Sequence, residues 1–157
     1  MELSCPTPAI SCAELRVAPR TQTAVDWPIQ VLLVEDNVEA AWLVQTWLQW
    51  TGGERFRVEW TRNVEEAMKR LSQPGIEVIL LDLGLPELNG YRSFGAIKAV
   101  AENHIPVVIL TADDSLLSRD LTVGFGASDY LLKGRVSSEK LRQSLFDAVR
   151  QGRPPLP

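Results

Sequence analysis

The segment 78–90, VILLDLGLPELNG, constrains the fold of this chain more than any other stretch. Its leading apolar residues run into a single carboxylate, Asp82, and turn-forming residues follow. A continuous apolar run that ends in turn residues is typical of a strand buried on both faces, as in a parallel sheet covered by helices. An ionised carboxylate isolated in an apolar interior is costly. Asp82 must therefore emerge into a cleft or meet a cation at the carboxyl end of its strand.

Similar patterns recur along the chain. Strands are predicted over four further segments: Ile29–Val34, Phe56–Trp60, Val107–Leu110 and Asp129–Leu132. A helical pattern follows each strand, with starts near Val38, Asn63, Gly90, Asp113 and Ser137. Alternating strands and helices predict an α/β domain built on a doubly wound five-stranded parallel sheet. The second strand alternates apolar and polar residues, which indicates an edge position in that sheet.

Polar residues stand where most of these strands end. They are Glu35 and Asp36 after the first strand, Asp82 after the third, Thr111 after the fourth and Lys133 after the fifth. Ligands of doubly wound sheets bind beyond the carboxyl ends of the strands, so we expect these side chains to form one site. Three clustered carboxylates repel one another and would raise one another's pKa, and a divalent cation between them relieves this repulsion. Oxygen ligands of this kind favour Mg²⁺.

The composition argues against several classes of protein. Acidic and basic residues are interleaved and the net charge is −4, so neither nucleic acid nor a membrane surface is expected as a direct partner. The chain has no signal-peptide pattern and no apolar run near the ~18 residues of a membrane span, which predicts a cytoplasmic protein. Cys5 and Cys12 fit neither a disulfide framework nor a zinc-ligand spacing, and we expect reduced thiols.

The boundaries of the domain follow from the same patterns. Residues 1–28 contain four prolines among serine, threonine and alanine, and they lack sustained periodicity, which predicts a mobile leader. Residues 29–151 form the predicted domain and residues 152–157 a short tail. We expect a single-domain protein that acts through protein contacts, although a domain cut from a longer protein would have the same sequence.

The first helix has two predicted faces. Its inward face comprises Ala40, Leu43, Val44, Trp47, Leu48 and Thr51 at about 100° per residue. Trp42 points nearly opposite. An outward tryptophan is a candidate anchor for a protein partner, and an incidental surface aromatic is the alternative.

The segments VLLVEDN, VILLDLGLPELNG, VVILTADD and GASDYLLKG together resemble the receiver domain of two-component response regulators, the CheY-like family. The resemblance covers about residues 29–151 and implies a flavodoxin-like strand order, 2-1-3-4-5. It implies an Mg²⁺ site made of Glu35, Asp36, Asp82 and the backbone carbonyl of Gly84. It also implies that Asp82 takes a phosphoryl group from a phosphohistidine on a histidine kinase or a histidine phosphotransfer protein.

The resemblance assigns further roles around that phosphoryl group. Thr111 and Lys133 would contact it, and a movement of Thr111 would let Tyr130 rotate inward as a switch. An ordinary strand aromatic is the alternative for Tyr130. The family usually has proline after the lysine, but Gly134 stands here, so we predict a trans peptide bond with Lys133 still directed at Asp82. The resemblance implies a signalling phosphoacceptor rather than an enzyme, with the downstream target unknown and a homodimer left open.

Other interpretations share parts of this pattern. In a flavodoxin-type module, Glu35 and Asp36 would repel the phosphate of the cofactor. A haloacid-dehalogenase-type phosphatase has a second aspartate two residues after the first, where this chain has Gly84. A receiver fold that serves as a docking module and is not phosphorylated in practice is the main alternative.

Overall fold

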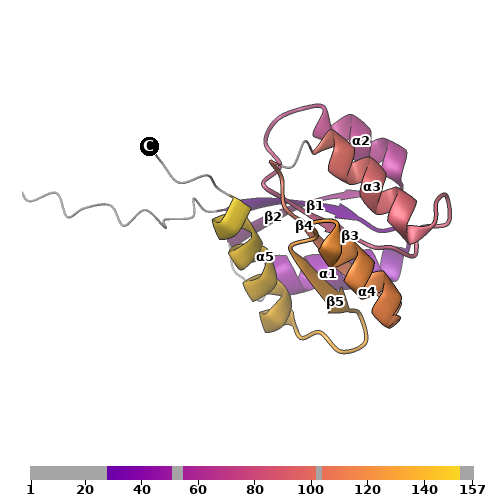
Figure 1. Cartoon of the computed structure of the whole chain (residues 1–157). Helices are drawn as coiled ribbons and strands as arrows, with labels where there is room; N and C mark the ends of the chain where they lie inside the picture. Colours follow the sequence, from indigo (N-terminus) through magenta and orange to yellow (C-terminus); the bar gives the residue numbers. More distant parts are fainter. Residues whose placement is uncertain (1–27, 51–54, 102–103, 153–157) are drawn as a thin grey trace, which may run out of the picture.

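The computed structural model describes residues 28–50, 55–101 and 104–152. Strands and helices alternate along them (Figure 1): β1 (Ile29–Val34), α1 (Val38–Gln49), β2 (Phe56–Thr61), α2 (Val64–Leu71), β3 (Val78–Leu81), α3 (Gly90–Val100), β4 (Val107–Thr111), α4 (Leu116–Gly124), β5 (Asp129–Leu132) and α5 (Ser138–Gly152). The five strands are parallel in the order β2-β1-β3-β4-β5, so the predicted doubly wound sheet is confirmed. Residues 1–27 and 153–157, which include both cysteines, lie outside the described residues.

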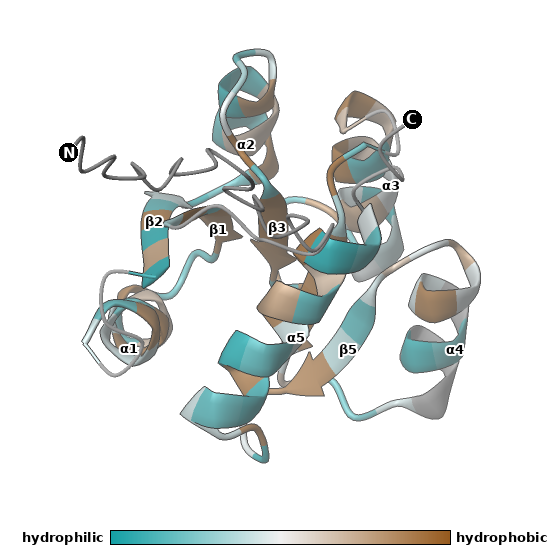
Figure 2. Ribbon diagram, turned by 90° about the vertical axis from the view of Figure 1, so that its left-hand side faces the viewer, coloured by the Kyte–Doolittle hydropathy of each residue, from teal (hydrophilic) through white to brown (hydrophobic). Residues whose placement is uncertain are grey.

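Each face of the sheet has its own apolar core because successive strand side chains point to opposite faces. Val31, Leu33 and Leu80 pack with residues of α1 and α5, whereas Leu32 and Ile79 pack with residues of α2 and α3. In Figure 2 the central strands β1 and β3 are hydrophobic, and β2 carries hydrophobic and hydrophilic residues in turn. This agrees with the edge position of β2. Burial of one such aliphatic side chain stabilises the fold by about 1.5 to 3 kcal/mol.

Asparagine residues start three of the helices. The side chains of Asn37, Asn63 and Asn89 each accept a hydrogen bond from the amide three residues later, at 3.0, 2.7 and 3.1 Å. These caps satisfy amides that have no partner within the helix. Asn37 and Asn89 lie shortly after β1 and β3, and they therefore fix where the chain turns away from the carboxyl edge of the sheet.

The inward face of α1 differs from the prediction. Ala41, Val44 and Leu48 are buried, whereas Leu43 is 42% exposed and Ala40 is half-buried. The prediction placed the inward face from the spacing of about 100° per residue alone. The buried face instead includes Ala41, a small residue that lets the helix pack closely on the sheet. Trp47 packs against the core as predicted, Trp42 is exposed, and Thr51 lies outside the described residues.

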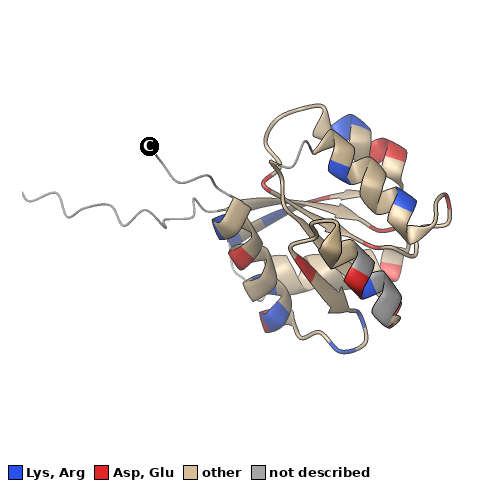
Figure 3. Cartoon of the chain, in the orientation of Figure 1, with Lys and Arg blue, Asp and Glu red and all other residues tan. Residues whose placement is uncertain are grey.

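Charged residues of both signs lie on α2 and α5 (Figure 3). In α2, Glu65 and Glu66 occupy the first turn, and Lys69 and Arg70 the last, which complements the helix dipole. No helix within the described ranges is long and apolar enough to cross a membrane.

Candidate phosphoryl-acceptor site

The polar residues predicted from the strand ends meet in one open cleft at the carboxyl edge of the sheet. The cleft has a volume of about 630 Å³. It is lined by Glu35, Asp36, Asn37, Asp82, Leu83, Gly84, Asn89, Gly90, Tyr91, Thr111, Ala112, Asp113 and Lys133. All six residues that the sequence assigned to the metal and phosphoryl positions are in this set, and Tyr130 and Trp42 are outside it.

The acidic residues of the cleft form a compact cluster. Glu35, Asp36 and Asp82 each offer a carboxylate oxygen, and these oxygens lie within 4.8 Å of one another. Glu35 and Asp82 are 1% and 6% exposed, whereas Asp36 is open to solvent. Oxygen ligands at this spacing suit a small divalent cation. The donor set therefore fits Mg²⁺, and the exposed Asp36 leaves room for the waters that Mg²⁺ usually keeps.

Lys133 connects two of the three acids. Its Nζ lies 2.7 Å from Asp82 Oδ2 and 2.5 Å from Glu35 Oε2. Burial lowers the pKa of Lys133, but hydrogen bonds to Asp82 and Glu35 outweigh burial, and its pKa is raised overall. Burial raises the pKa of Glu35, against the opposing effect of Lys133. One cation thus stands beside three carboxylates, which leaves negative charge for a metal ion to neutralise.

Asp82 is oriented by hydrogen bonds from both sides. Its backbone N–H donates to Val34 O at 3.0 Å, and the Gly84 N–H donates to Asp82 Oδ1 at 2.9 Å. Oδ1 is thus held by the following loop and Oδ2 by Lys133. A Cβ at position 84 would lie 3.4 Å from both carboxylate oxygens, so glycine keeps the space in front of Asp82 open.

Thr111 and Tyr130 contact the same backbone segment. The Asp113 N–H donates to Thr111 Oγ1 at 3.3 Å, and the Tyr130 hydroxyl donates to Asp113 O at 2.7 Å. Burial and the nearby charge of Asp113 raise the pKa of Tyr130 to about 12. The predicted switch pair is therefore bridged by one residue, Asp113. Sequence reasoning missed this bridge because it considered Asp113 only as a helix cap.

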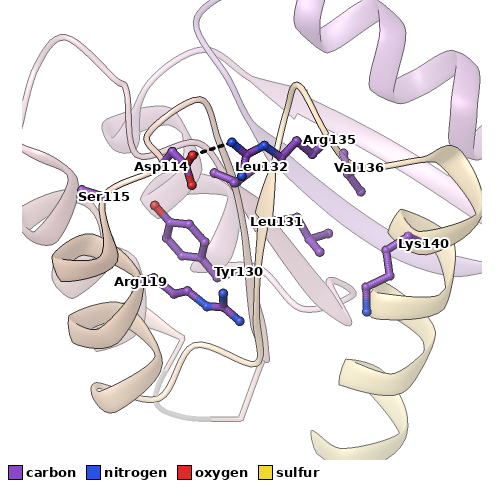
Figure 4. A pocket seen from close by; sticks show the side chains of 9 residues that line it. All are labelled: Asp114, Ser115, Arg119, Tyr130, Leu131, Leu132, Arg135, Val136 and Lys140. Carbon is purple, nitrogen blue, oxygen red and sulfur yellow. Dashed lines mark ion pairs between the residues drawn. The ribbon is translucent and has the colours of Figure 1, made fainter.

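A smaller pocket lies beside Tyr130, between α4 and α5 (Figure 4). It has a volume of about 200 Å³ and is lined by Asp114, Ser115, Arg119, Tyr130, Leu131, Leu132, Arg135, Val136 and Lys140. Arg135 Nη2 pairs with Asp114 Oδ2 at 2.8 Å across its rim. Any movement of the Tyr130 ring would change the shape of this pocket. The sequence did not predict it because its walls come from separate segments.

Trp42 stands on the outer side of α1 and is 66% exposed. Val38, one helical turn earlier, is exposed too. Helix α1 begins directly after Asp36 and its cap Asn37, which line the cleft.

Comparisons with known proteins agree with this arrangement. Residues 31–146 match the response regulator receiver domain family. The chain is 35% identical over 105 residues to the swarming motility regulation protein RssB of Serratia marcescens. That alignment covers 67% of this chain and 46% of RssB, so the chain spans less than half of the length of this relative.

Solved structures share the fold. A CheY-like response regulator receiver domain from Methanospirillum hungatei JF-1 superposes with a TM-score of 0.68 at 18% identity, covering 79% of this chain and 95% of that chain. A response regulator from Burkholderia pseudomallei was solved with a phosphorylated aspartic acid, a calcium ion and citrate. It superposes with a TM-score of 0.64 at 24% identity, covering 74% of this chain and 66% of that chain. These identities show the fold alone. The family match over most of the chain shows more: this chain belongs to the response regulator receiver domain family of two-component systems.

Proposed function

We propose that Asp82 accepts a phosphoryl group from a phosphohistidine on a histidine kinase or a histidine phosphotransfer protein, in an Mg²⁺-dependent reaction. The observation that carries the proposal is the position of its carboxylate. Asp82 is buried on the floor of an open cleft, between two further acids and Lys133. The phosphorylated aspartic acid in the Burkholderia pseudomallei response regulator is a precedent within the same fold.

The proposed step is a transfer between two nucleophiles. An Asp82 carboxylate oxygen attacks the phosphorus atom, the phosphorus–nitrogen bond of the phosphohistidine breaks, and the electron pair returns to the imidazole. The product on this chain is an acyl phosphate. Lys133 Nζ, already 2.7 Å from Asp82, neutralises negative charge on the transferring group, and the Thr111 hydroxyl donates to one of its oxygens.

The metal site of this proposal is the acidic cluster. Glu35, Asp36 and Asp82 would bind Mg²⁺ through their carboxylates and Gly84 through its backbone carbonyl. Bound Mg²⁺ supplies positive charge to the oxygens of the phosphoryl group. The support is the charge balance of the cleft, where three carboxylates stand near one lysine.

The signal is proposed to leave the cleft through Thr111 and Tyr130. When the Thr111 hydroxyl turns to donate to the acyl phosphate, its contact with the Asp113 N–H changes. The backbone carbonyl of Asp113 also accepts a hydrogen bond from the Tyr130 hydroxyl. Displacement of Asp113 would therefore release the Tyr130 ring and reshape the pocket between α4 and α5. Phosphorylation would thus shift the population of two states of this surface.

The proposal extends to the bounds of the receiver, its location and its contact with a partner. Residues 29–151 act as the receiver, with residues 1–28 as a leader and 152–157 as a tail, in the cytoplasm of a bacterial cell. The described helix α5 extends one residue beyond the expected boundary, to Gly152. Trp42 is proposed to contact the phosphohistidine-bearing partner.

A small-molecule phosphodonor tests the function without a partner. The purified protein is incubated with the donor and Mg²⁺, and its intact mass is measured. We expect one added phosphoryl mass in the wild type, none when the metal is chelated, and none in Asp82→Asn. Lack of uptake by the folded wild type would favour the alternative, a receiver fold that only docks partners.

A further inference from the structure

The edge strand β2 reaches into the acidic site through Trp60. The indole Nε1–H of Trp60 donates to the backbone carbonyl oxygen of Glu35 at 2.7 Å. The next residue, Thr61, accepts the Glu35 N–H through its backbone carbonyl at 3.0 Å. The backbone of Glu35 is therefore held by β2 at both its N–H and its carbonyl.

The Trp60 contact bears directly on Asp36. The carbonyl of Glu35 and the N–H of Asp36 belong to one planar peptide unit, so the indole fixes the orientation of the unit that precedes Asp36. The unit that follows Asp36 is fixed as well, because the Asn37 N–H donates to Glu35 Oε1 at 3.1 Å. The side chain of Asp36 is exposed, and packing therefore does not set its direction. The two held peptide units set the direction of its Cα–Cβ bond instead.

The Trp60 ring is itself well supported. It is partly buried against the core that β1 shares with α1 and α5, and its register partner on β1 is Leu33. The guanidinium of Arg62 lies 5.0 Å from the centroid of the ring, a distance at which a cation attracts the aromatic face. The indole N–H is thus presented to Glu35 by a ring with little freedom to move.

We propose that Trp60 is a positioning residue that aims the Asp36 carboxylate at the acidic cluster and so raises the affinity for Mg²⁺. This inference rests on the proposed function for its metal, but the contact itself exists in the metal-free protein. Trp60→Phe removes the N–H donor and keeps an aromatic ring under Arg62. Trp50→Phe is the matched control, because Trp50 is 84% exposed at the far end of α1.

The first readout uses metal-free protein and amide hydrogen exchange followed by NMR. The Glu35 amide, which donates to Thr61 O, should exchange faster in Trp60→Phe than in the wild type, and at the wild-type rate in Trp50→Phe. In the wild type, the Trp60 indole proton should exchange more slowly than the Trp50 indole proton, which also provides a test should Trp60→Phe fail to fold. Equal exchange of the two indole protons, or an unchanged Glu35 amide in the folded variant, would overturn the role of Trp60.

The second readout is Mg²⁺ binding by calorimetry. Loss of one hydrogen bond should weaken binding by about threefold to tenfold in Trp60→Phe and leave Trp50→Phe unchanged. Uptake from a small phosphodonor should need correspondingly more Mg²⁺ but reach the wild-type rate at saturation. A loss of rate that saturating Mg²⁺ does not restore would indicate a merely structural role and contradict the inference. A wild type that binds no Mg²⁺ would instead contradict the proposed function.

Discussion

Two of the regions that contain short ion pairs differ in burial and in charge balance. At the carboxyl edge of the sheet, Lys133 contacts Glu35 and Asp82, whose side chains are 1% and 8% exposed. Between β2 and α2, Arg70 holds Glu59 with two hydrogen bonds of 2.5 and 2.8 Å, and the Glu59 side chain is 41% exposed. The contact distances are similar in both regions.

Contact distance alone therefore does not identify a functional cluster. Glu59 and Arg70 balance each other, and solvent screens them, so the pair stabilises the fold by only about 0.2 to 1 kcal/mol. The cleft holds three carboxylates and one lysine. Its low exposure to solvent strengthens the electrostatic interactions among these charges. An unbalanced and partly buried cluster is where a metal ion and a phosphoryl group can bind.

The largest effect is expected from a substitution that removes the cation of the buried cluster. Lys133→Ala should lower the rate of phosphoryl uptake from a small phosphodonor by about 100-fold or more, because it removes a preorganised cation beside the transferring group. The rate is followed by intact mass at saturating Mg²⁺. Arg70→Ala removes the cation of the exposed pair and should leave this rate unchanged. Similar losses in both variants would erase the distinction between the two regions.

The second prediction distinguishes the chemistry of the cleft from the docking of a protein partner beside it. Trp42→Ala should slow transfer from the cognate kinase by about 30-fold, since a hot-spot aromatic contributes about 2 kcal/mol to an interface. Transfer from a small phosphodonor, which needs no docking surface, should stay at the wild-type rate. Loss with both donors would mean that Trp42 supports the fold, and loss with neither would mean that it is not a docking residue.

The third prediction concerns the exposed member of the acidic cluster. Asp36→Ala should weaken Mg²⁺ binding by at least about tenfold in calorimetry, since even residues that only orient metal ligands have effects of this size. The melting temperature should change little because Asp36 is exposed. Glu59→Gln is the control outside the cleft. Wild-type Mg²⁺ affinity in Asp36→Ala would remove Asp36 from the proposed metal site.

The smallest effect is an opposite pH dependence of stability in the two regions. A hydrogen bond from Arg70 lowers the pKa of Glu59 from 4.5, so its stabilisation is present above pH 4.5 and is lost as pH falls through the folded pKa. Burial raises the pKa of Glu35 from 4.5, so stability instead falls as pH rises from 4.5 through its folded pKa.

Denaturant unfolding in metal-free buffer at a series of pH values measures both effects. Glu59→Gln should lose less than about 1 kcal/mol near neutral pH and nothing at the acidic end. Glu35→Gln should flatten the decline of stability above pH 4.5. If both substitutions changed the pH dependence of the free energy of unfolding in the same direction relative to the wild type, the contrast between the regions would be wrong.

The sequence predicted the strand ends well because apolar runs and turn residues are local signals. Glu35, Asp36, Asp82, Thr111 and Lys133 therefore fell into one cleft, as the parallel topology requires. Contacts that depend on how elements pack were beyond such patterns. The buried face of α1, and with it the exposure of Leu43, depends on how closely the helix packs on the sheet.

Contacts between distant segments were beyond the sequence for a related reason. Trp60 meets the Glu35 carbonyl only because β2 pairs with β1 in one register, with Leu33 opposite Trp60. Tyr130 on β5 contacts Asp113 in the loop between β4 and α4. Hydrophobic periodicity carries no signal for either hydrogen bond, although each connects a residue of the proposed mechanism to the rest of the fold.

Asp82 is tested most directly as the phosphoryl acceptor by locating the phosphoryl group on the chain. Wild-type protein is phosphorylated with a small-molecule donor and Mg²⁺, then treated with borohydride, which reduces an acyl phosphate of aspartate to homoserine. Peptide mass spectrometry identifies the altered residue. We expect homoserine at position 82 and unchanged aspartate at position 36. Homoserine at another carboxylate, or none after confirmed uptake, would contradict Asp82 as the acceptor.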